Sequence, residues 1–202
     1  MKNQKIILIA SEGTNVGKSH LARLIKRSAK DCSILSFADP LKESCDKEFR
    51  SLYPFTSKTF TQYYSKREYK DEIISKVDIN ITDKIGAFTF REFLIKISDF
   101  YKARYGFDFF IKKSVARSLE VSNSLVVFDD FRLPFEYDFL ESEYGKDNIL
   151  TVLLDKVNKK GSETNSYEGA LKDFKFDIEF TYTENYDNLE SLLALIGEFI
   201  YD

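Results

Sequence analysis

Short apolar runs alternate along the chain with longer segments in which apolar residues recur at helical spacing. Five runs have the length of strands, and several are apolar on consecutive positions, as expected for strands buried on both faces of a sheet. They are Lys5–Ala10, Ser33–Phe37, Leu125–Asp129, Ile149–Leu154 and Asp177–Tyr182. Helical patterns fill the gaps. The repeated order of strand, loop and helix predicts a parallel sheet covered by helices on both faces, a three-layer α/β fold.

The chain between Pro40 and Ser124 is too long for a single crossover connection. Its periodic segments predict four helices, at Leu41–Phe49, about Arg67–Lys76, Phe90–Tyr101 and Phe107–Leu119. Two further segments, Ser51–Tyr64 and Asp78–Thr89, lack a clear period, so we expect loops that could close over a site. We interpret residues of about 41–120 as a helical insertion on the substrate side of a single domain of residues 1–202.

The C-terminal part of the chain carries one more helical pattern. Apolar residues of Asn188–Tyr201 recur on one face, which predicts packing rather than chemistry. The polar stretch at residues 156–162 predicts an exposed loop, and a small lid could lie at about residues 156–170.

Composition narrows the class of protein. The 202 residues are 43% apolar and 15% aromatic, which is enough to build a packed core. The 30 basic and 33 acidic residues nearly balance, so the totals predict no basic face and no nucleic-acid partner. No run approaches the ~20 apolar residues that span a bilayer, and the first residues lead into a strand rather than a signal-peptide core. We expect no membrane partner and a cytoplasmic location, in the host cytoplasm if the source is viral, and leave a homodimer open.

Soft metal ligands are scarce in the sequence. Cys32 and Cys45 are its only cysteines, and His20 is its only histidine. These three residues make no ligand set for zinc or an iron–sulfur cluster, and two unpaired thiols fit a reducing compartment.

The segment with the clearest chemistry is Ser11–Ser19, which follows the first predicted strand and precedes the helix-like stretch His20–Ile25. A turn with little side-chain bulk exposes backbone N–H groups, and the positive end of the following helix faces the same anion. We expect Lys18 to reach the β- and γ-phosphates of ATP, and the Ser19 hydroxyl to hold a Mg²⁺ ion bridging the same oxygens. The context predicts a phosphate-binding loop.

The match to the full phosphate-loop pattern is incomplete, because Glu12 occupies the first glycine position and the nearest glycine, Gly13, comes one residue later. The competing interpretation is an ordinary helix start, where Gly-Lys-Ser is common. The strand before and the amphipathic helix after favour the phosphate loop. The predicted ATP-binding residues here are Gly13, Thr14, Asn15, Val16, Gly17, Lys18, Ser19 and His20, the last with a side chain expected to pack or cap rather than to act as a base.

A second constellation follows the third predicted strand, where Asp129, Asp130 and Arg132 come in close succession. Ligands of open parallel sheets bind at the carboxyl ends of the strands, so these charges should fall beside the phosphate loop. A carboxylate there can hold Mg²⁺ or its waters, and an arginine fork can stabilise a phosphoryl group. Successive strand residues point to opposite faces, so only one acid is expected to face the metal. The alternative is that Asp130 caps the helix after Pro134.

The insertion supplies further candidate cations. Asp39 could cap a helix that begins at Pro40, while Lys42, one turn inside, could meet a second phosphate. Four arginines also lie in the insertion: Arg67, Arg91, Arg104 and Arg117. We expect one or two of them to point inward and bind phosphate, and Arg91 is the first choice. The aromatic run Phe107–Phe110 could stack on a base or belong to the core, and Asp108 within it could recognise the base or sugar.

Taken together, these segments resemble the phage-type deoxynucleoside monophosphate kinases and, more remotely, the phosphomevalonate kinases, both of the nucleoside monophosphate kinase-like P-loop fold. The resemblance runs through most of the chain. Its segments are Gly17-Lys18-Ser19, Ala38-Asp39-Pro40-Leu41-Lys42, Arg67-Glu68 with Lys70, Arg91-Glu92-Phe93-Leu94, Tyr105-Gly106-Phe107-Asp108-Phe109-Phe110 and, most specific, Asp130-Phe131-Arg132-Leu133-Pro134-Phe135-Glu136.

This chain departs from the family's pattern at three places. Asn165-Ser166-Tyr167-Glu168 stands where the family usually has His and Ser or Thr before the Glu. Ser19 follows the loop lysine where members often have Asp, and Asp39 stands where they have a small residue. A changed substrate is compatible with these differences.

The resemblance implies a three-layer P-loop NTPase fold with a helical substrate-binding insertion, and a Mg²⁺-ATP-dependent kinase that converts a deoxynucleoside monophosphate to its diphosphate. It implies catalytic roles for Lys18, Asp130 and Arg132, and a metal site at Ser19 with Asp129 or Asp130; the family match favours Asp130. Acceptor-binding residues would be Asp39, Lys42, Arg67, Arg91, Asp108 and Arg132, and Asn185 would line the adenine. The alternatives are a kinase for another small phosphate or alcohol, or a P-loop regulatory ATPase without a small acceptor.

Overall fold

The computed structural model describes residues 4–11, 13, 16–74, 88–156, 168–182 and 188–201. The chain divides into two compact units, one formed by residues 1–37 and 114–202 and the other by residues 38–113. The second unit falls close to the helical insertion predicted at about residues 41–120. No helix in the described part of the chain is long and apolar enough to cross a membrane.

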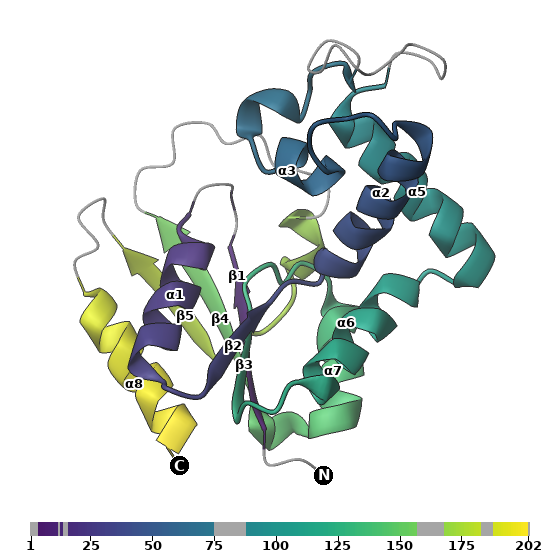
Figure 1. The fold of residues 1–202 in the computed structure, drawn as a ribbon. Coiled ribbons are helices and arrows are strands. Elements are labelled where there is room, and N and C mark those ends of the chain that lie inside the picture. The colour runs from purple at the N-terminus through teal and green to yellow at the C-terminus, as the bar shows by residue number, and fades with distance from the viewer. Residues whose placement is uncertain are drawn as a thin grey trace. The chain divides into compact units, whose positions relative to one another are not determined.

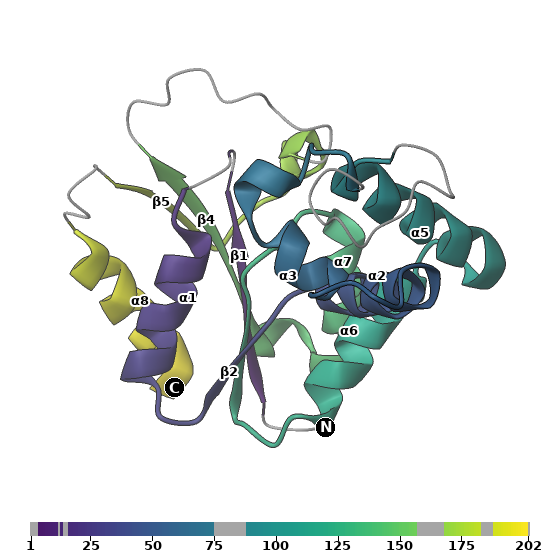
Figure 2. The same cartoon turned by 45° about the horizontal axis from the view of Figure 1, so that its top comes forward.

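The first unit is built on a five-stranded sheet in which every pairing is parallel. Its strands are β1 Lys5–Ala10, β2 Cys32–Leu35, β3 Leu125–Phe128, β4 Ile149–Lys156 and β5 Ile178–Tyr182, in the spatial order β2-β3-β1-β4-β5 (Figures 1 and 2). All five predicted strands are present, and β1 has its predicted bounds. β2 and β3 end before their predicted ends, because Ser36 and Asp129 already belong to the turns at the sheet edge.

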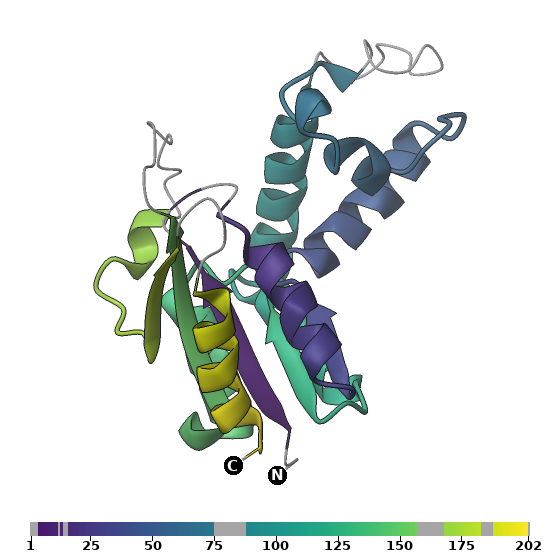
Figure 3. The same cartoon turned by 90° about the vertical axis from the view of Figure 1, so that its left-hand side faces the viewer.

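Helices cover both faces of this sheet, which makes the unit compatible with a three-layer Rossmann-like or P-loop fold (Figures 1 and 3). α1 Lys18–Ser28 and α8 Leu189–Tyr201 lie on one face. α7 Pro134–Tyr144 lies on the other with the C-terminal part of α6 Phe109–Glu120, a helix that begins in the second unit. The short 3-10 helices η2 Lys146–Asn148 and η3 Glu168–Leu171 flank β4 along the chain.

The core between the sheet and the first pair of helices follows the side-chain alternation of the strands. Ile7 and Ile9 of β1 pack with Leu21 and Ile25 of α1 and with Leu192 of α8. The intervening β1 residues are equally inaccessible, because residues 6–10 are all 0% exposed. A strand buried on both faces explains why its sequence is a continuous apolar run rather than an alternating one.

The second unit is helical, with α2 Asp39–Leu52, α3 Phe60–Tyr64, η1 Arg67–Tyr69, α5 Phe90–Tyr105 and the start of α6. Its core is aromatic: the ring of Phe49 lies 5.9 Å from Phe60, 6.0 Å from Phe90 and 5.8 Å from Phe93, centroid to centroid. α5 begins at a capping box in which Thr89 and Glu92 each bind the other's backbone N–H.

Three local predictions in this unit need correction. The expectation of a loop at Ser51–Tyr64 is wrong, because α3 lies within this segment. α3 begins at the Thr59–Gln62 capping box, and its aromatic side chains are buried in the core of the unit. The helix is too short to show a hydrophobic period. Of the helix expected at Arg67–Lys76, residues 67–69 form the 3-10 turn η1 and Ile73 makes an isolated bridge to Thr89, while residues 75 and 76 lie outside the described part of the chain. α5 runs four residues past its predicted end to Tyr105 and stops at Gly106, whose φ of 102° favours glycine. Most of the other expected loop, Asp78–Thr89, lies outside the described residues.

Candidate functional site

The turn between β1 and α1 is shaped by Gly17. This residue is the N-cap of α1 with φ 85° and ψ 15°, a left-handed conformation that glycine adopts without a side-chain penalty. The N–H groups of His20 and Leu21 both donate to its carbonyl oxygen at 2.9 Å, which closes the first helical turn. We call the segment of residues 11–17 the Gly17 loop; Thr14 and Asn15, which were predicted to bind ATP, lie outside the described residues, as does Glu12.

Side chains tie the Gly17 loop to the elements around it. The buried Ser11 hydroxyl donates to the Gly13 carbonyl at 2.7 Å and accepts from the Lys18 ammonium at 2.6 Å. Lys18 therefore folds back from the helix start across the loop. On the far side, the hydroxyl of Tyr182, at the end of β5 and 2% exposed, donates to the Val16 carbonyl. These contacts hold the described residues Ser11, Gly13 and Val16 of the loop.

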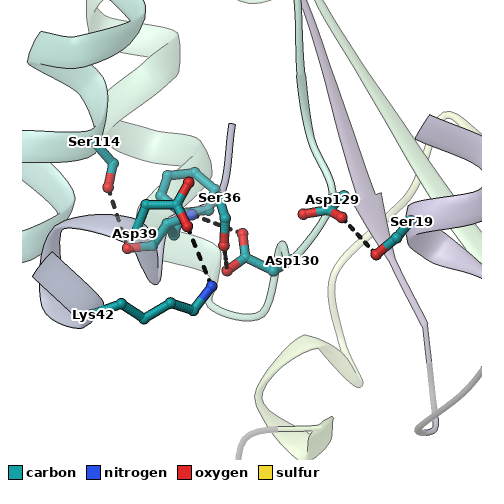
Figure 4. A network of polar contacts seen from close by, with 8 residues as sticks. Ser19, Ser36, Asp39, Lys42, Ser114, Asp129 and Asp130 are labelled. Atoms are coloured by element: carbon teal, nitrogen blue, oxygen red, sulfur yellow. Dashed lines mark hydrogen bonds and ion pairs between the residues drawn. The ribbon is translucent and has the colours of Figure 1, made fainter. Parts of the chain in front are cut away.

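Ser19 and Asp129 lie against each other although they are 110 residues apart in the sequence. The Ser19 hydroxyl donates to Asp129 Oδ2 at 2.7 Å, as Figure 4 shows. Asp129 reaches this position because β3 runs parallel beside β1, which brings the carboxyl ends of both strands to one edge. A carboxylate and a hydroxyl are hard oxygen donors of the kind that Mg²⁺ takes.

Asp130 points to a different neighbour. Its carboxylate accepts from the Ser36 hydroxyl and from the Phe37 backbone N–H, the latter at 2.7 Å (Figure 4). The Phe37 carbonyl accepts from Ser114 at 3.2 Å, so this acid belongs to a polar connection between the ends of β2 and β3 and the helix α6. The Ser19 hydroxyl thus contacts Asp129 and not Asp130, whereas the sequence-based preference placed Asp130 on the metal side.

The helix after Pro134 is capped by Glu136 rather than by Asp130. Glu136 Oε2 accepts from the backbone N–H groups of Arg132 at 2.8 Å and Leu133 at 3.1 Å. The Glu136 side chain is 5% exposed, and this burial raises the pKa of its carboxyl group to about 8, with the nearby charge of Asp130 acting in the same direction. Arg132 itself is exposed, directly after the turn that carries both aspartates.

Residues predicted to bind an acceptor in the second unit have partners of their own. Lys42 pairs with Asp39 across one turn of α2 at 3.2 Å. Arg91 Nε lies 2.6 Å from Asp71 Oδ1, and that contact raises the pKa of the guanidinium. Asp108 lies 2.7 Å from Lys112. Lys42 and Arg91 therefore each have a carboxylate partner, and Asp108 has an ammonium partner, within the second unit.

The remaining candidates are spread over several segments. Arg67 is exposed on η1, Arg104 lies over the Tyr105 ring at 5.4 Å, and Arg117 is half-buried in the part of α6 that belongs to the first unit. Phe110 is buried, as expected of a core aromatic, whereas Phe107 is 66% exposed and Phe109 stacks on the exposed Tyr105 with centroids 4.8 Å apart. Asn185 and residues 157–167 of the expected lid lie outside the described residues.

Four contributors to the site were not singled out from the sequence: Ser11, Ser36, Glu136 as a cap, and Tyr182. Serines and tyrosines are common, and two of these contacts, those of Ser36 and Tyr182, join segments 94 and 166 residues apart. Only Glu136 had a local signal, since a Glu two residues after a helix-starting Pro is a frequent capping position. Comparison of the sequence with models of protein families and with curated proteins found no match.

Proposed function

We propose that this chain is a Mg²⁺-ATP-dependent kinase of the P-loop type that transfers the γ-phosphoryl group to the phosphate of a deoxynucleoside monophosphate. The observation that carries the proposal is the set of contacts at the start of α1, where Ser19 donates to Asp129 and the neighbouring Lys18 donates to Ser11. It combines a cation, a hydroxyl and a carboxylate with a helix N-terminus, which are the parts that phosphoryl transfer requires.

The proposed binding of the phosphates follows from the loop geometry. The first N–H groups of a helix have no intrahelical acceptor and point toward an anion at its N-terminus. Lys18 comes from the same turn and now lies against the Ser11 hydroxyl at 2.6 Å, so a short movement would carry its ammonium to a β- or γ-phosphate. Because Gly17 adopts φ 85°, the loop can approach the phosphates closely.

The donor set at Ser19 and Asp129 fits Mg²⁺. Their oxygens are 2.7 Å apart and the Ser19 side chain is exposed, so solvent can supply the waters that Mg²⁺ usually keeps. Ser19 and Asp129 would hold the metal, Asp129 either directly or through a water. The ion would neutralise charge on the β- and γ-phosphate oxygens.

The acceptor is the part of the proposal that rests on resemblance. Arg132 follows the same strand end as Asp129, and its planar fork suits a phosphoryl or phosphate group. In the second unit, Lys42, Arg67 and Arg91 are proposed to bind the acceptor phosphate, which requires Lys42 and Arg91 to exchange their aspartate partners for substrate.

A coupled assay of ADP release over the common nucleoside and deoxynucleoside monophosphates tests the function. We expect rapid release only with the right acceptor, and a loss of ~10²-fold or more in Lys18→Ala, because the loop lysine contacts charge that develops during transfer. Lys26→Ala, an exposed lysine in the last turn of the same helix, is the matched control. Slow ADP release that no monophosphate accelerates would indicate a regulatory ATPase, and wild-type turnover by Lys18→Ala would contradict the phosphate-loop assignment.

A further inference from the structure

The turn from β3 to α7 carries Asp129, Asp130 and Arg132, and its backbone is held at several points. The Asp129 N–H donates to the Leu35 carbonyl of β2 at 3.3 Å, and the Phe131 N–H donates to the Ile9 carbonyl of β1 at 3.2 Å. The next two N–H groups, those of Arg132 and Leu133, have no strand beside them and donate instead to one oxygen of Glu136. The Glu136 carboxyl group is thus the acceptor for the part of the turn that has no hydrogen bond to the sheet.

The position of Glu136 suits this task. Leu133 is the N-cap of α7 and its side chain has no acceptor atom, so a cap has to come from elsewhere in the helix. Glu136 lies in the first turn, is 5% exposed, and reaches back over Pro134 to both N–H groups. A buried side chain has little rotamer freedom, so its acceptor oxygen holds the turn more rigidly than an exposed cap would.

Burial of this carboxyl group has an energetic cost that an exposed cap would avoid. Transfer of the ionised form out of water raises its pKa to about 8, so near neutral pH the group is largely protonated. A protonated carboxyl group keeps an acceptor oxygen, so the two backbone hydrogen bonds survive in that state. The contact therefore depends on an oxygen at this position and not on a negative charge.

We propose that Glu136 is a positioning residue of the nucleotide site: by accepting from the backbone of Arg132 and Leu133, it sets where the Arg132 guanidinium and the Asp129 carboxylate leave the sheet edge. This inference rests on the proposed kinase function, in which both side chains act on phosphate or metal. Glu136 itself touches neither substrate nor metal and acts through the backbone. Phe131, 1% exposed and packed on Phe174 with centroids 5.2 Å apart, anchors the same turn from the other side.

Three substitutions separate the acceptor oxygen from the charge and from general stability. Glu136→Gln removes the charge and keeps a carbonyl acceptor, whereas Glu136→Leu has a similar size and no acceptor. Glu136→Asp keeps the carboxyl group but is one methylene too short, and it replaces the Leu variant if that variant does not fold. Glu143→Ala, at an exposed position of the same helix, is the matched control.

Turnover with the best acceptor and amide exchange in residues 129–137 are measured on each folded variant. We expect kcat/KM to fall roughly 10- to 100-fold in Glu136→Leu or Glu136→Asp, since small misplacements of catalytic groups have effects of this size. ATP affinity, which depends on the Gly17 loop, should change less than about threefold, and the Arg132 and Leu133 amides should exchange faster. Glu136→Gln should restore both readouts, and Glu143→Ala should leave them unchanged.

Two outcomes would overturn the role of Glu136 alone: wild-type kcat/KM in the Leu or Asp variant, or a loss in Glu136→Gln as large as in Glu136→Leu, which would assign the effect to charge. An equal loss of ATP affinity and turnover would also overturn it, because general destabilisation predicts that pattern. Absence of acceptor-dependent ADP release and of ATP binding in the wild-type chain would overturn the proposed function instead, and this role with it.

Discussion

At the scale of single residues, the two adjacent aspartates have separate tasks. Asp129 lies 2.7 Å from the Ser19 hydroxyl, whereas Asp130 accepts from Ser36 and from the Phe37 N–H. The first contact is at the helix start proposed to bind phosphate, and the second joins the ends of two strands. Substitution of one acid should therefore affect metal dependence, and substitution of the other should affect stability.

Asparagine at each position tests this division. Asp129→Asn should raise the Mg²⁺ concentration for half-maximal ADP release roughly tenfold, because an amide is a weaker Mg²⁺ ligand than a carboxylate. Asp130→Asn should lower the free energy of unfolding by about 1–3 kcal/mol, because a charged acceptor of two hydrogen bonds is lost. Mg²⁺ titrations and urea unfolding measure the two effects. If neither variant alters the Mg²⁺ dependence, the acids do not serve the metal, although nucleotide binding could persist.

A second prediction at this scale concerns Glu136 and the pH dependence of the free energy of unfolding. Its folded-state pKa of about 8 lies above the ordinary value of 4.5 because of burial, with Asp130 opposing and Arg132 favouring ionisation. The folded chain then holds this proton more tightly than the unfolded chain. The contribution of the Glu136 carboxyl group to the free energy of unfolding is therefore complete below pH 4.5 and is lost as the pH rises through 8. Glu136→Gln should flatten this dependence and exceed the wild type in stability at pH 9.

Urea unfolding at pH 5, 7 and 9 checks this prediction. The difference in unfolding free energy between Glu136→Gln and the wild type should grow steadily with pH. The exposed Glu143→Gln in the same helix should show no such trend. Parallel curves for Glu136→Gln and the wild type would mean that the carboxyl group titrates at its ordinary pKa.

At the scale of elements, the Gly17 loop joins β1, whose residues 6–10 are all buried, to α1, the helix whose start is proposed to bind phosphate. Gly17 with φ 85° and Gly145 with φ 78° both have a positive φ, but ψ is 15° at Gly17 and 149° at Gly145. Gly145 ends α7, and a Cβ there would meet nothing within 4 Å. Both positions favour glycine, in two different backbone conformations.

Gly17→Ala and Gly145→Ala form a matched pair. Each should lose about 1–3 kcal/mol of unfolding free energy, the cost of a side chain at a strained positive φ. Only Gly17→Ala should also weaken ATP binding, by tenfold or more, because the N–H groups of the loop would move relative to the phosphates. Thermal unfolding and ATP titration measure these effects. A similar loss of ATP affinity in both variants would show that binding follows global stability rather than the loop.

At the scale of the whole molecule, bound nucleotide should stabilise the folded state. A ligand that binds only the folded chain adds RT ln(1 + [L]/Kd), or ~2.7 kcal/mol at a concentration of 100 Kd. Mg²⁺-ATP should therefore raise Tm of the wild type by several degrees. Lys18→Ala should lose most of this rise, and Lys26→Ala should keep it. A rise of equal size in Lys18→Ala would place the nucleotide elsewhere on the molecule.

Much of the architecture could be predicted because it depends on local patterns. Continuous apolar runs located all five strands, since strands buried on both faces of a parallel sheet have no polar side. The helices after Gly17 and Pro134 began where glycine and proline favour a start. The five-residue helix α3 was not predicted, because one and a half turns are too short to show a hydrophobic period. Its aromatic side chains pack against residues of helices that are distant in the sequence.

The sequence by itself determined where the five strands and the longer helices form, and that Lys18 and Ser19 stand at a helix start behind a buried strand. Backbone preference and hydrophobic period are properties of neighbouring residues. Only the tertiary structure decided which aspartate meets Ser19, that Asp130 joins two strand ends, and that Tyr182 holds the Val16 carbonyl. These contacts span 94 to 166 residues of sequence. They arise from the strand order β2-β3-β1-β4-β5, which brings distant chain segments to one edge of the sheet.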